Sequence, residues 1–428
     1  MKMKRIWTTA IAAAMGLGLV IPAFTPTLHA DEEKLTVWTW DPNFNIYAME
    51  EAAKIYKESH PDFQLDCKEV PWPELQTKLN TIVSSNALDT LPDIFLCQDN
   101  AYQKNVQAFP EIFTDLTDSG IDFSQFAEAK TNYSVVNGRN YGVPFDNGTV
   151  VAAYRTDYLE EAGFTIDDFT DITWEEFIEK GKVVYEKTKH PLISSTAETD
   201  LLMMMLQSAG ASLFDSEGNP MIEGNVVLKQ VIDLHKQMID AKVLEIVNDW
   251  DQYVGSFTNG NVAGTINGCW ILATVQTAED QAGKWKITNL PRLAIEGATN
   301  YSNNGGSSWA VSKGQNEALS IDFLNATFAS SKKLYETILP SSGAMATWLP
   351  MADSDVYGEP QAYFDGQKVY QLLTEFAGKV PLNNTGVFYY EARDAVAVAM
   401  QNSINGADID AELATAQAQV EHQMHNAG

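Results

Sequence analysis

The sequence predicts an α/β protein with two lobes, and three observations support this prediction. The chain has 428 residues, roughly three times the usual size of one domain. Hydrophobic residues make up 45% of it, enough for a buried core despite a formal net charge of −29. Short apolar strands alternate with amphipathic helices after residue 34, which is typical of a parallel, doubly wound sheet.

The first thirty residues have the layout of a secretory signal, with three basic residues, an apolar run over 6–23 and small residues up to Ala30. Glycines and Pro22 interrupt the run, which is short for a membrane span, so we expect cleavage near Ala30 rather than an anchor. No cysteine follows the run to carry a lipid. We therefore expect a soluble protein in the periplasm or another extracytoplasmic space. With 28 − 3 = 25 basic and 57 acidic residues, its net charge would be −32.

The acidic excess argues against general nucleic-acid binding, because a polyanion would have to approach a strongly negative surface. Cys67, Cys97 and Cys269 are an odd number at wide spacings, which predicts no disulfide framework. None lies at zinc-ligand spacing from a histidine, so we expect no metal site and no cofactor.

A β-α-β-α-β order opens the predicted first lobe. A strand over 35–40 runs directly into a helix that Asp41 and Pro42 begin as cap and first-turn residue. A strand over 63–67, a helix over 75–83 and a strand over 92–96 follow. In doubly wound sheets, ligands bind at the carboxyl ends of the strands. One rim of the sheet is therefore predicted to carry Trp40, Asp41, Gln98, Asp99 and Asn100, although the two aspartates could serve only as helix caps.

Gly-Pro punctuation over 138–146 and a fresh strand over 149–154 indicate the crossing into a second lobe. Thr173 and Glu176 form a capping box that begins another helix. Asn267 and Gly268 end a short strand just before Trp270. A stretch rich in Gly, Asn and Ser over 303–308 then enters a strand with Trp309, which we interpret as the crossing back. The predicted lobes are residues 31–142 with 307–350, and 143–306 with 351–428.

Aromatic residues at predicted strand ends and loop entries indicate the ligand chemistry. They are Trp40, Trp270, Trp309 and Tyr389, each with acids or amides nearby. Flat aromatics beside planar hydrogen-bonding groups suit the apolar faces and hydroxyl rim of a sugar ring. The nucleophile elbow, the metalloprotease helix motif and the phosphate-binding glycine loops are all absent from residues 31–428. A glycosidase needs only two carboxylates, and 57 acidic residues make any particular pair uninformative.

The chain resembles the extracellular solute-binding proteins of carbohydrate ABC importers, the family that includes the maltose-binding protein. The segments that carry the resemblance are 35–40, 91–94, 138–146 with 154–157, 266–270 and 305–312. An Asn-Gly-Cys-Trp turn at 267–270 replaces the commoner Asn-Gly-Pro-Trp.

The resemblance implies two α/β lobes that close on a ligand about hinge segments. It also implies that Trp270 and Tyr389 stack on sugar and that Asp99 and Asn100 supply polar contacts. In this fold the first strand lies between the second and third, which would place Cys67 and Cys97 ~9.5 Å apart, too far for a disulfide.

The sequence-based hypothesis is a non-catalytic, monomeric receptor that captures an oligosaccharide and delivers it to a membrane permease. A polyamine-binding protein of the same fold, suggested by the negative charge, and a secreted glycan hydrolase or lyase are the alternatives. The predicted ligand-binding residues are Trp40, Asp41, Gln98, Asp99, Asn100, Asp146, Asn267, Gly268, Trp270, Gly306, Trp309, Tyr389 and Arg393.

Overall fold

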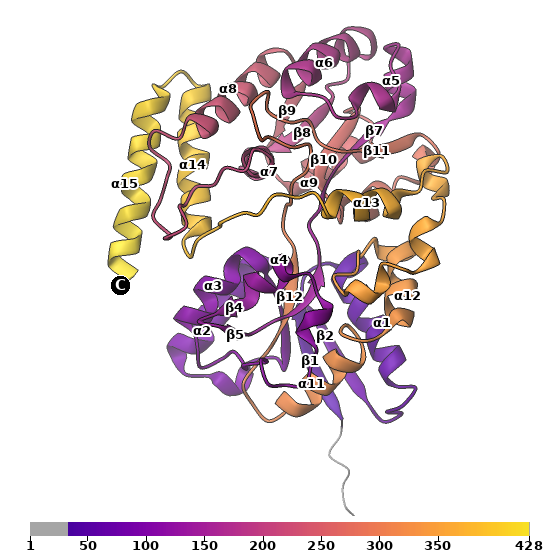
Figure 1. The fold of residues 1–428 in the computed structure, drawn as a ribbon, viewed down its shortest axis with the longest axis vertical. Coiled ribbons are helices and arrows are strands. Elements are labelled where there is room, and N and C mark those ends of the chain that lie inside the picture. The colour runs from indigo at the N-terminus through magenta and orange to yellow at the C-terminus, as the bar shows by residue number, and fades with distance from the viewer. Residues whose placement is uncertain (1–32, 428) are drawn as a thin grey trace, which may run out of the picture.

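The computed structural model describes residues 33–427, and the predicted signal segment lies outside them. Figure 1 shows two α/β lobes stacked along the long axis of the molecule, which confirms the predicted fold class. The lower lobe contains the start of the chain and the upper lobe its middle part. Among residues 33–427, no helix has both the length and the apolar composition that a membrane crossing requires.

A five-stranded sheet forms the centre of the first lobe, with strand order β2-β1-β3-β12-β6. Strand β1 is parallel to β2 and β3, and β12 is antiparallel to β3 and β6. The strands are β1 (Lys34–Thr39), β2 (Gln64–Glu69), β3 (Ile94–Gln98), β6 (Val143–Asp146) and β12 (Ser307–Val311). Because β1 separates β2 from β3, Cys67 and Cys97 lie on non-adjacent strands, and both are free thiols, as predicted.

The helices of this lobe begin and end where the sequence supplies capping groups. Asp41 accepts hydrogen bonds from the N–H groups of Asn43 (2.8 Å) and Phe44 (3.1 Å) and so caps the chain's entry into α1. A short π-helical turn (Pro42–Ile46) precedes α1. Asn86 in the left-handed conformation ends α2. The helices are α1 (Tyr47–Tyr56), α2 (Trp72–Ser85), α3 (Asp99–Ala108), α4 (Glu128–Thr131), α11 (Glu317–Ala326) and α12 (Lys332–Ser342), and β4 (Val135–Val136) and β5 (Arg139–Asn140) form a short hairpin.

The second lobe has a three-stranded antiparallel sheet, β10-β7-β11, and a parallel pair, β8-β9. Its strands are β7 (Val150–Arg155), β8 (Ile193–Thr196), β9 (Leu244–Val247), β10 (Gly264–Gly268) and β11 (Trp285–Thr288). Its helices are α5 (Thr156–Glu161), α6 (Trp174–Thr188), α7 (Asp200–Ser208), α8 (Val226–Asp240), α9 (Trp250–Thr258), α10 (Ile271–Val275), α13 (Val369–Ala377), α14 (Tyr389–Ile404) and α15 (Ile409–Ala427). The capping box predicted at Thr173 and Glu176 begins α6.

The predicted boundary after residue 142 is wrong by one strand. It assigns β6 to the second lobe, whereas β6 pairs with β12 at the edge of the first sheet. Pro144 suggested a break in the chain, but an edge strand tolerates proline because one side of the strand needs no N–H donor. The chain leaves the first sheet only after Asp146.

Two segments that cross between the lobes lie side by side. Thr149 and Asn303 form an antiparallel bridge, and the Asn304 N–H donates to the Gly148 carbonyl over 2.7 Å. Gly148 is required here because a Cβ would collide with the Asn304 carbonyl. A third segment joins them where Asp146 bridges Ala346.

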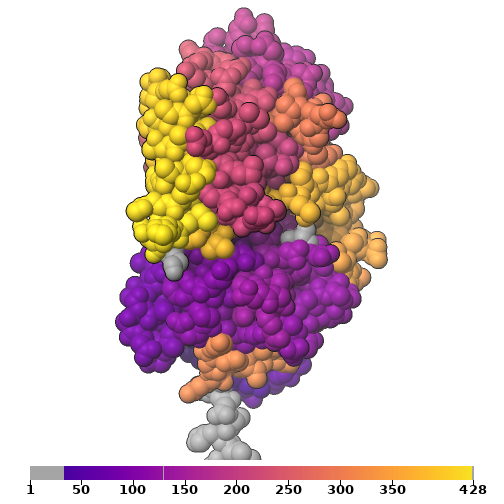
Figure 2. Space-filling model, turned by 60° about the vertical axis from the view of Figure 1, so that its left-hand side comes forward, coloured from indigo at the N-terminus to yellow at the C-terminus, as the bar shows by residue number. Residues whose placement is uncertain are grey.

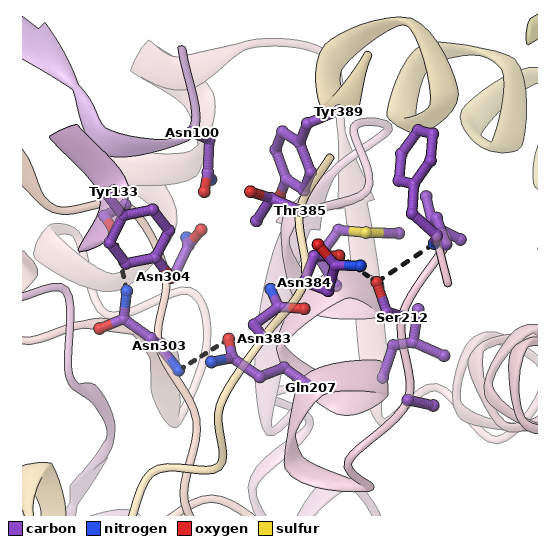
Figure 3. A pocket seen from close by; sticks show the side chains of 16 residues that line it. Asn100, Tyr133, Gln207, Ser212, Asn303, Asn304, Asn383, Asn384, Thr385 and Tyr389 are labelled. Carbon is purple, nitrogen blue, oxygen red and sulfur yellow. Dashed lines mark hydrogen bonds between the residues drawn. The ribbon is translucent and has the colours of Figure 1, made fainter. Parts of the chain in front are cut away.

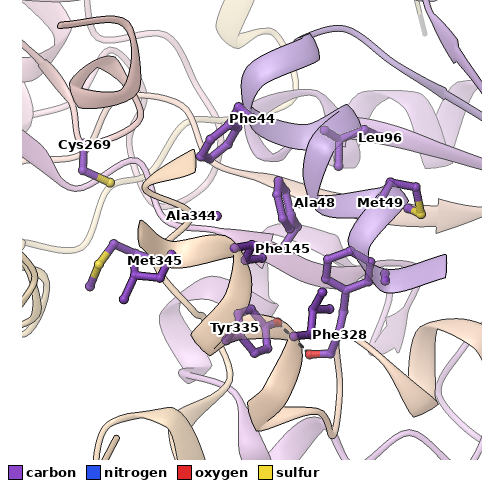
Figure 4. Packing of buried hydrophobic residues seen from close by; sticks show 14 of the residues in the cluster. Phe44, Ala48, Met49, Leu96, Phe145, Cys269, Phe328, Tyr335, Ala344 and Met345 are labelled. Carbon is purple, nitrogen blue, oxygen red and sulfur yellow. Dashed lines mark hydrogen bonds between the residues drawn. The ribbon is translucent and has the colours of Figure 1, made fainter. Parts of the chain in front are cut away.

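Aromatic packing holds the first lobe together beneath these crossings (Figure 4). The ring of Phe145 lies 5.5 Å from Phe44, 5.5 Å from Phe328 and 5.2 Å from Trp309, measured between centroids. All four side chains are buried. The cluster therefore ties the turn before α1, β6 and β12 to the turn after α11.

The C-terminal helices return to the junction of the lobes. Residues 378–388 run from α13 to α14 (Figure 1). Figure 2 shows the first lobe below and the second lobe above, with α14 and α15 in yellow beside the seam between them. Lys104 of α3 forms an ion pair with Glu391 of α14 across this seam.

Candidate functional site

A cleft of ≈ 770 Å³ lies between the lobes. Both lobes and the crossing segments line it, so a molecule bound there touches both lobes. Its volume falls within the range of roughly 300–1,000 Å³ that is usual for small-molecule sites. The residues that line the cleft include Asp99, Gln103, Lys130, Tyr133, Gln207, Glu217, Asn303, Met345, Trp348, Leu349, Val380, Pro381, Leu382, Asn383 and Thr385.

Amides and two tyrosines surround one end of the cleft, which we call the amide end and define by Asn100, Tyr133, Gln207, Asn303, Asn383, Thr385 and Tyr389. These residues line a small cavity that adjoins the cleft, and five of them line both. Figure 3 shows Tyr133 and Asn100 on one side of this space and Thr385, Tyr389 and Asn383 on the other. The Gln207 amide donates to the Pro381 carbonyl over 3.1 Å and accepts the Asn303 N–H over 3.3 Å, whereas the side-chain amides of Asn100 and Asn383 have no such partner among the described residues. They are therefore free to bind the hydroxyl groups of a ligand.

A buried ion pair supports the floor of the cleft. Lys130 donates to a carboxylate oxygen of Asp99 and to the Ser307 carbonyl over 2.9 Å. Asp99 also accepts a hydrogen bond from the Ser308 hydroxyl over 3.1 Å. Burial raises the pKa of Asp99 to about 6, and the ammonium of Lys130 opposes this rise. The pair therefore brings no net charge to the cleft.

Gly306 allows this ion pair to form. Its φ is +96°, and a Cβ at this position would lie 2.5 Å from an Asp99 carboxylate oxygen. Its carbonyl accepts the Asp99 N–H over 3.0 Å. Asp146 is buried next to it and accepts a hydrogen bond from the Ser307 hydroxyl, and burial raises its pKa. Gly306 and Asp146 thus shape the floor without lining the cleft.

A hydrogen-bond network positions Asn304 at the amide end. The Asn304 amide donates to the side chain of Asn267 over 2.8 Å and to Asp200 over 3.4 Å. Arg393 forms an ion pair with Asp200 over 3.3 Å. Asn267 and Arg393 were predicted to bind ligand, but neither lines the cleft or the small cavity. They act through Asn304, which lines the small cavity.

Trp270 is half-buried and lies behind the same segment. Its Nε1–H donates to the Asn304 carbonyl over 3.1 Å, and its ring packs 5.9 Å from that of Trp250. A Cβ on Gly268 would collide with the Trp270 ring, which explains the glycine. Neither residue lines the cleft, so the predicted stacking of Trp270 on a ligand is not seen in this arrangement.

The prediction that Trp309 faces the cleft is wrong. Trp309 has no exposed surface and packs against Phe145 and Phe328. β12 is an interior strand of the first sheet, and its side chains on both faces are buried. The Gly-Ser stretch before Trp309 indicated a loop entry, whereas Ser307 and Ser308 already pair with β3.

Three residues predicted for the rim also lie outside the cleft. Trp40 is half-buried, and its ring packs 5.5 Å from that of Trp72. Asp41 serves as the helix cap described above, which was the alternative interpretation. Gln98 lies at the end of β3 and accepts a hydrogen bond from the Tyr390 hydroxyl of the second lobe. Of the thirteen predicted residues, Asp99, Asn100 and Tyr389 line the cleft or the small cavity.

Several lining residues had no signal in the sequence. Tyr133, Lys130 and Gln103 lie on or near short helices without a recognisable motif. Asn303 was visible as part of the Gly/Asn/Ser stretch, and the Asn-Asn-Thr sequence at 383–385 offered a similar polar clue. Only the fold brings residues from 99–149, 207–218, 303 and 345–387 to one cleft.

Known proteins resemble this chain over most of its length. Residues 51–364 match the family described as bacterial extracellular solute-binding proteins. The lactose-binding protein of Rhizobium radiobacter is 38% identical over 415 residues, covering 96% of this chain and 97% of the relative. The arabinooligosaccharide-binding protein of Halalkalibacterium halodurans is 24% identical over 359 residues, covering 81% and 79%.

Solved structures of similar fold include two binding proteins. The ABC-transporter-associated binding protein of B. animalis subsp. lactis in complex with β-1,6-galactobiose has a TM-score of 0.75 at 20% identity, covering 92% of this chain and 96% of that one. The GacH receptor of Streptomyces glaucescens has a TM-score of 0.76 at 17% identity, covering 90% and 96%. The extent of the family match and the 38% identity together show that this chain belongs to the bacterial extracellular solute-binding proteins.

Proposed function

We propose that this protein is the substrate-binding protein of an ABC importer and that it captures a neutral galactoside disaccharide such as lactose. The observation that carries the proposal is an amide-rich cleft to which both lobes contribute and whose buried carboxylate, Asp99, is paired with Lys130. The 38% identity to a lactose-binding protein supports the choice of sugar. After export, the monomeric protein would deliver the sugar to the membrane permease of its importer.

The charges in the cleft favour a neutral ligand over a polyamine. Asp99 is already paired with Lys130, and Glu217 is the other carboxylate in the lining, at an exposed position. A polyamine needs several carboxylates without partners around its ammonium groups. Amides can both donate to and accept from sugar hydroxyls, so Asn100, Gln207 and Asn383 suit a disaccharide.

Capture would work by a shift between conformations. A sugar that contacts both lobes stabilises the arrangement in which they are close together, in proportion to its preference for that arrangement. Tyr133 comes from the first lobe, while Gln207 and Tyr389 come from the second. The relatives named above are binding proteins, and a hydrolase or lyase activity has no support from them.

Titration calorimetry on residues 31–428 tests the proposal, with lactose, maltose, arabinobiose and spermidine as separate ligands. We expect lactose to bind with a 1:1 stoichiometry and to be recovered intact after prolonged incubation. Binding of spermidine without binding of any sugar would overturn the proposal, and cleavage of lactose would revive the enzymatic alternative.

Tyr133 offers a matched pair of variants for the same measurement. Its ring is half-buried and lines both the cleft and the small cavity. We expect Tyr133→Ala to weaken lactose binding by about tenfold or more, because the flat surface for the sugar is lost. Tyr133→Phe keeps that surface, so its affinity should stay within a few-fold of the original. Equal losses in both variants would show that the ring does not stack on the sugar.

A further inference from the structure

The cleft has a second end whose lining differs sharply from the amide end. Residues from 345–349 and 380–382 form it, and we call it the apolar end. It consists of Met345, Ala346, Thr347, Trp348, Leu349, Val380, Pro381 and Leu382, and the buried Thr347 supplies the one side-chain hydroxyl among them. None of these residues lines the small cavity, and the Gln207 amide donates to the Pro381 carbonyl over 3.1 Å, so the apolar end lies directly beside the amide end. Tyr133, Asn303 and Asn383 line both spaces and mark the passage between them.

Two leucines at the apolar end are unusually exposed. Leu382 is 81% exposed and Leu349 is 50% exposed, and both belong to the small set of large hydrophobic side chains with this much contact with water. Leucine at such positions gains free energy when an apolar group covers it, roughly in proportion to the area covered. Their convergence on one cleft distinguishes them from isolated surface leucines.

The apolar end suits a different chemistry from the hydroxyl groups of a free sugar. Side chains of Met345, Val380 and Leu382 offer no hydrogen bond to hydroxyl groups, which would lose their bonds to water there. The lining at this end holds no lysine, arginine, aspartate or glutamate from 345–349 or 380–382. An uncharged hydrocarbon group attached to the sugar would suit this lining, because such a group needs neither a hydrogen-bond partner nor an opposite charge.

We propose that the apolar end binds the hydrocarbon aglycone of a glycoside whose sugar lies at the amide end, so that the ligand class includes alkyl and aryl galactosides as well as disaccharides. This inference rests on the proposed function, because the sugar ring fixes which part of the ligand reaches the apolar end. Continuity of the two spaces through Tyr133 and Asn383 allows one molecule to occupy both.

Calorimetry with methyl, phenyl and hexyl β-D-galactopyranosides and with lactose tests the inference on residues 31–428. Burial of each methylene group is worth about fourfold in affinity, so we expect hexyl galactoside to bind at least tenfold more tightly than methyl galactoside. Phenyl galactoside should show a gain of similar size. Equal affinity for all three glycosides, with lactose bound, would overturn the inference and leave the proposed function intact. Absence of binding by lactose and by every galactoside would overturn both.

Variants at the exposed leucine separate aglycone binding from lobe closure. Leu382→Asn removes the apolar surface at a position where folding does not depend on burial. It should reduce the hexyl-to-methyl affinity ratio severalfold. Val226→Asn is the matched control, because Val226 is 75% exposed and lies outside the cleft. If Leu382→Asn weakens the binding of all galactosides equally, Leu382 acts in lobe closure rather than in aglycone binding, and the inference is contradicted.

Discussion

The buried pair of Lys130 and Asp99 is the strongest electrostatic feature among the cleft residues. The side chains are 4% and 1% exposed, so neither charge can be solvated in place of its partner. Lys130→Met removes the cation and leaves the carboxylate uncompensated. We expect a loss of about 3–5 kcal/mol in the free energy of unfolding at neutral pH, measured by urea denaturation. A loss below about 1 kcal/mol would show that water reaches Asp99.

The same variant should have a pH dependence of defined sign. Burial raises the pKa of Asp99 to about 6, above its ordinary value of 3.8 in the unfolded chain. The folded state thus binds this proton more tightly, and ionising Asp99 reduces stability as the pH rises from about 4 through 6. Without Lys130 the pKa rises further. The stability difference between Lys130→Met and the original protein should therefore be larger at pH 7.5 than at pH 5, and an unchanged or inverted difference would contradict this assignment.

Tryptophans show what a sequence can indicate about single residues and what it cannot. Trp309 and Trp270 both follow Gly, Asn or Ser, and the local pattern predicts the same exposed position for each. Strand pairing decides otherwise, because β12 lies between β3 and β6 and buries Trp309 on the face shared with Phe145. Trp270 follows the end of β10 and stays half-buried. The order of the strands is a property of the whole sheet, and the residues next to a tryptophan in the sequence do not reveal that order.

At the scale of elements, the strands and helices of the first lobe were predictable. The order β1-α1-β2-α2-β3 follows from alternation, helical spacing and the cap at Asp41, all of which are local signals. The boundary at β6 was missed because a proline is compatible either with a break in the chain or with an edge strand, and Pro144 lies in an edge strand. The cleft was predictable only at Asp99, Asn100 and Tyr389, since other lining residues come from segments that meet only through the fold.

The paired crossing segments make a prediction about Gly148. A methyl group there would meet the Asn304 carbonyl, which is backbone and cannot rotate away. Gly148→Ala should therefore separate the crossings and cost about 1–3 kcal/mol in the free energy of unfolding, measured by urea denaturation. Gly314→Ala is the control, because a Cβ at Gly314 has open space around it and should leave the free energy of unfolding nearly unchanged. Gly163 is unsuitable because its positive φ would itself strain an alanine. Similar losses in the Gly148 and Gly314 variants would rule out the close approach as the cause.

Contact between the end of β3 and α14 joins the lobes beside the cleft. The Tyr390 hydroxyl donates to the side chain of Gln98, and this bond exists only while the lobes hold their present positions. Tyr390→Phe should weaken lactose binding by about two- to tenfold, as expected for one hydrogen bond, in calorimetric titrations. Tyr158→Phe is the control, because it removes a 3.0 Å bond to the Gly260 carbonyl within the second lobe. Equal affinities in the two variants would show that the contact between Gln98 and Tyr390 does not influence capture.

At the scale of the whole molecule, the net charge favours a cationic ligand, whereas the lining of the cleft favours a neutral one. Residues 31–428 carry a net charge of −32, which attracts any cation without requiring a site. The cleft pairs its buried carboxylate with Lys130 and presents amides. A sugar bound in the cleft should therefore be insensitive to salt, whereas a polyamine held by the surface should be released by it.

Thermal unfolding of residues 31–428 at two salt concentrations separates these cases. A ligand that binds only the folded state at a hundredfold excess over its dissociation constant adds about 2.7 kcal/mol of stability. We expect lactose to raise the unfolding midpoint equally at about 0.05 and about 1 M NaCl, although the screening length falls to about 3 Å at the higher concentration. Spermidine should raise the midpoint, if at all, only at low salt. A spermidine effect that persists at high salt, without an effect of lactose, would show that the cleft selects cations, and the neutral-sugar assignment would fail for the whole molecule.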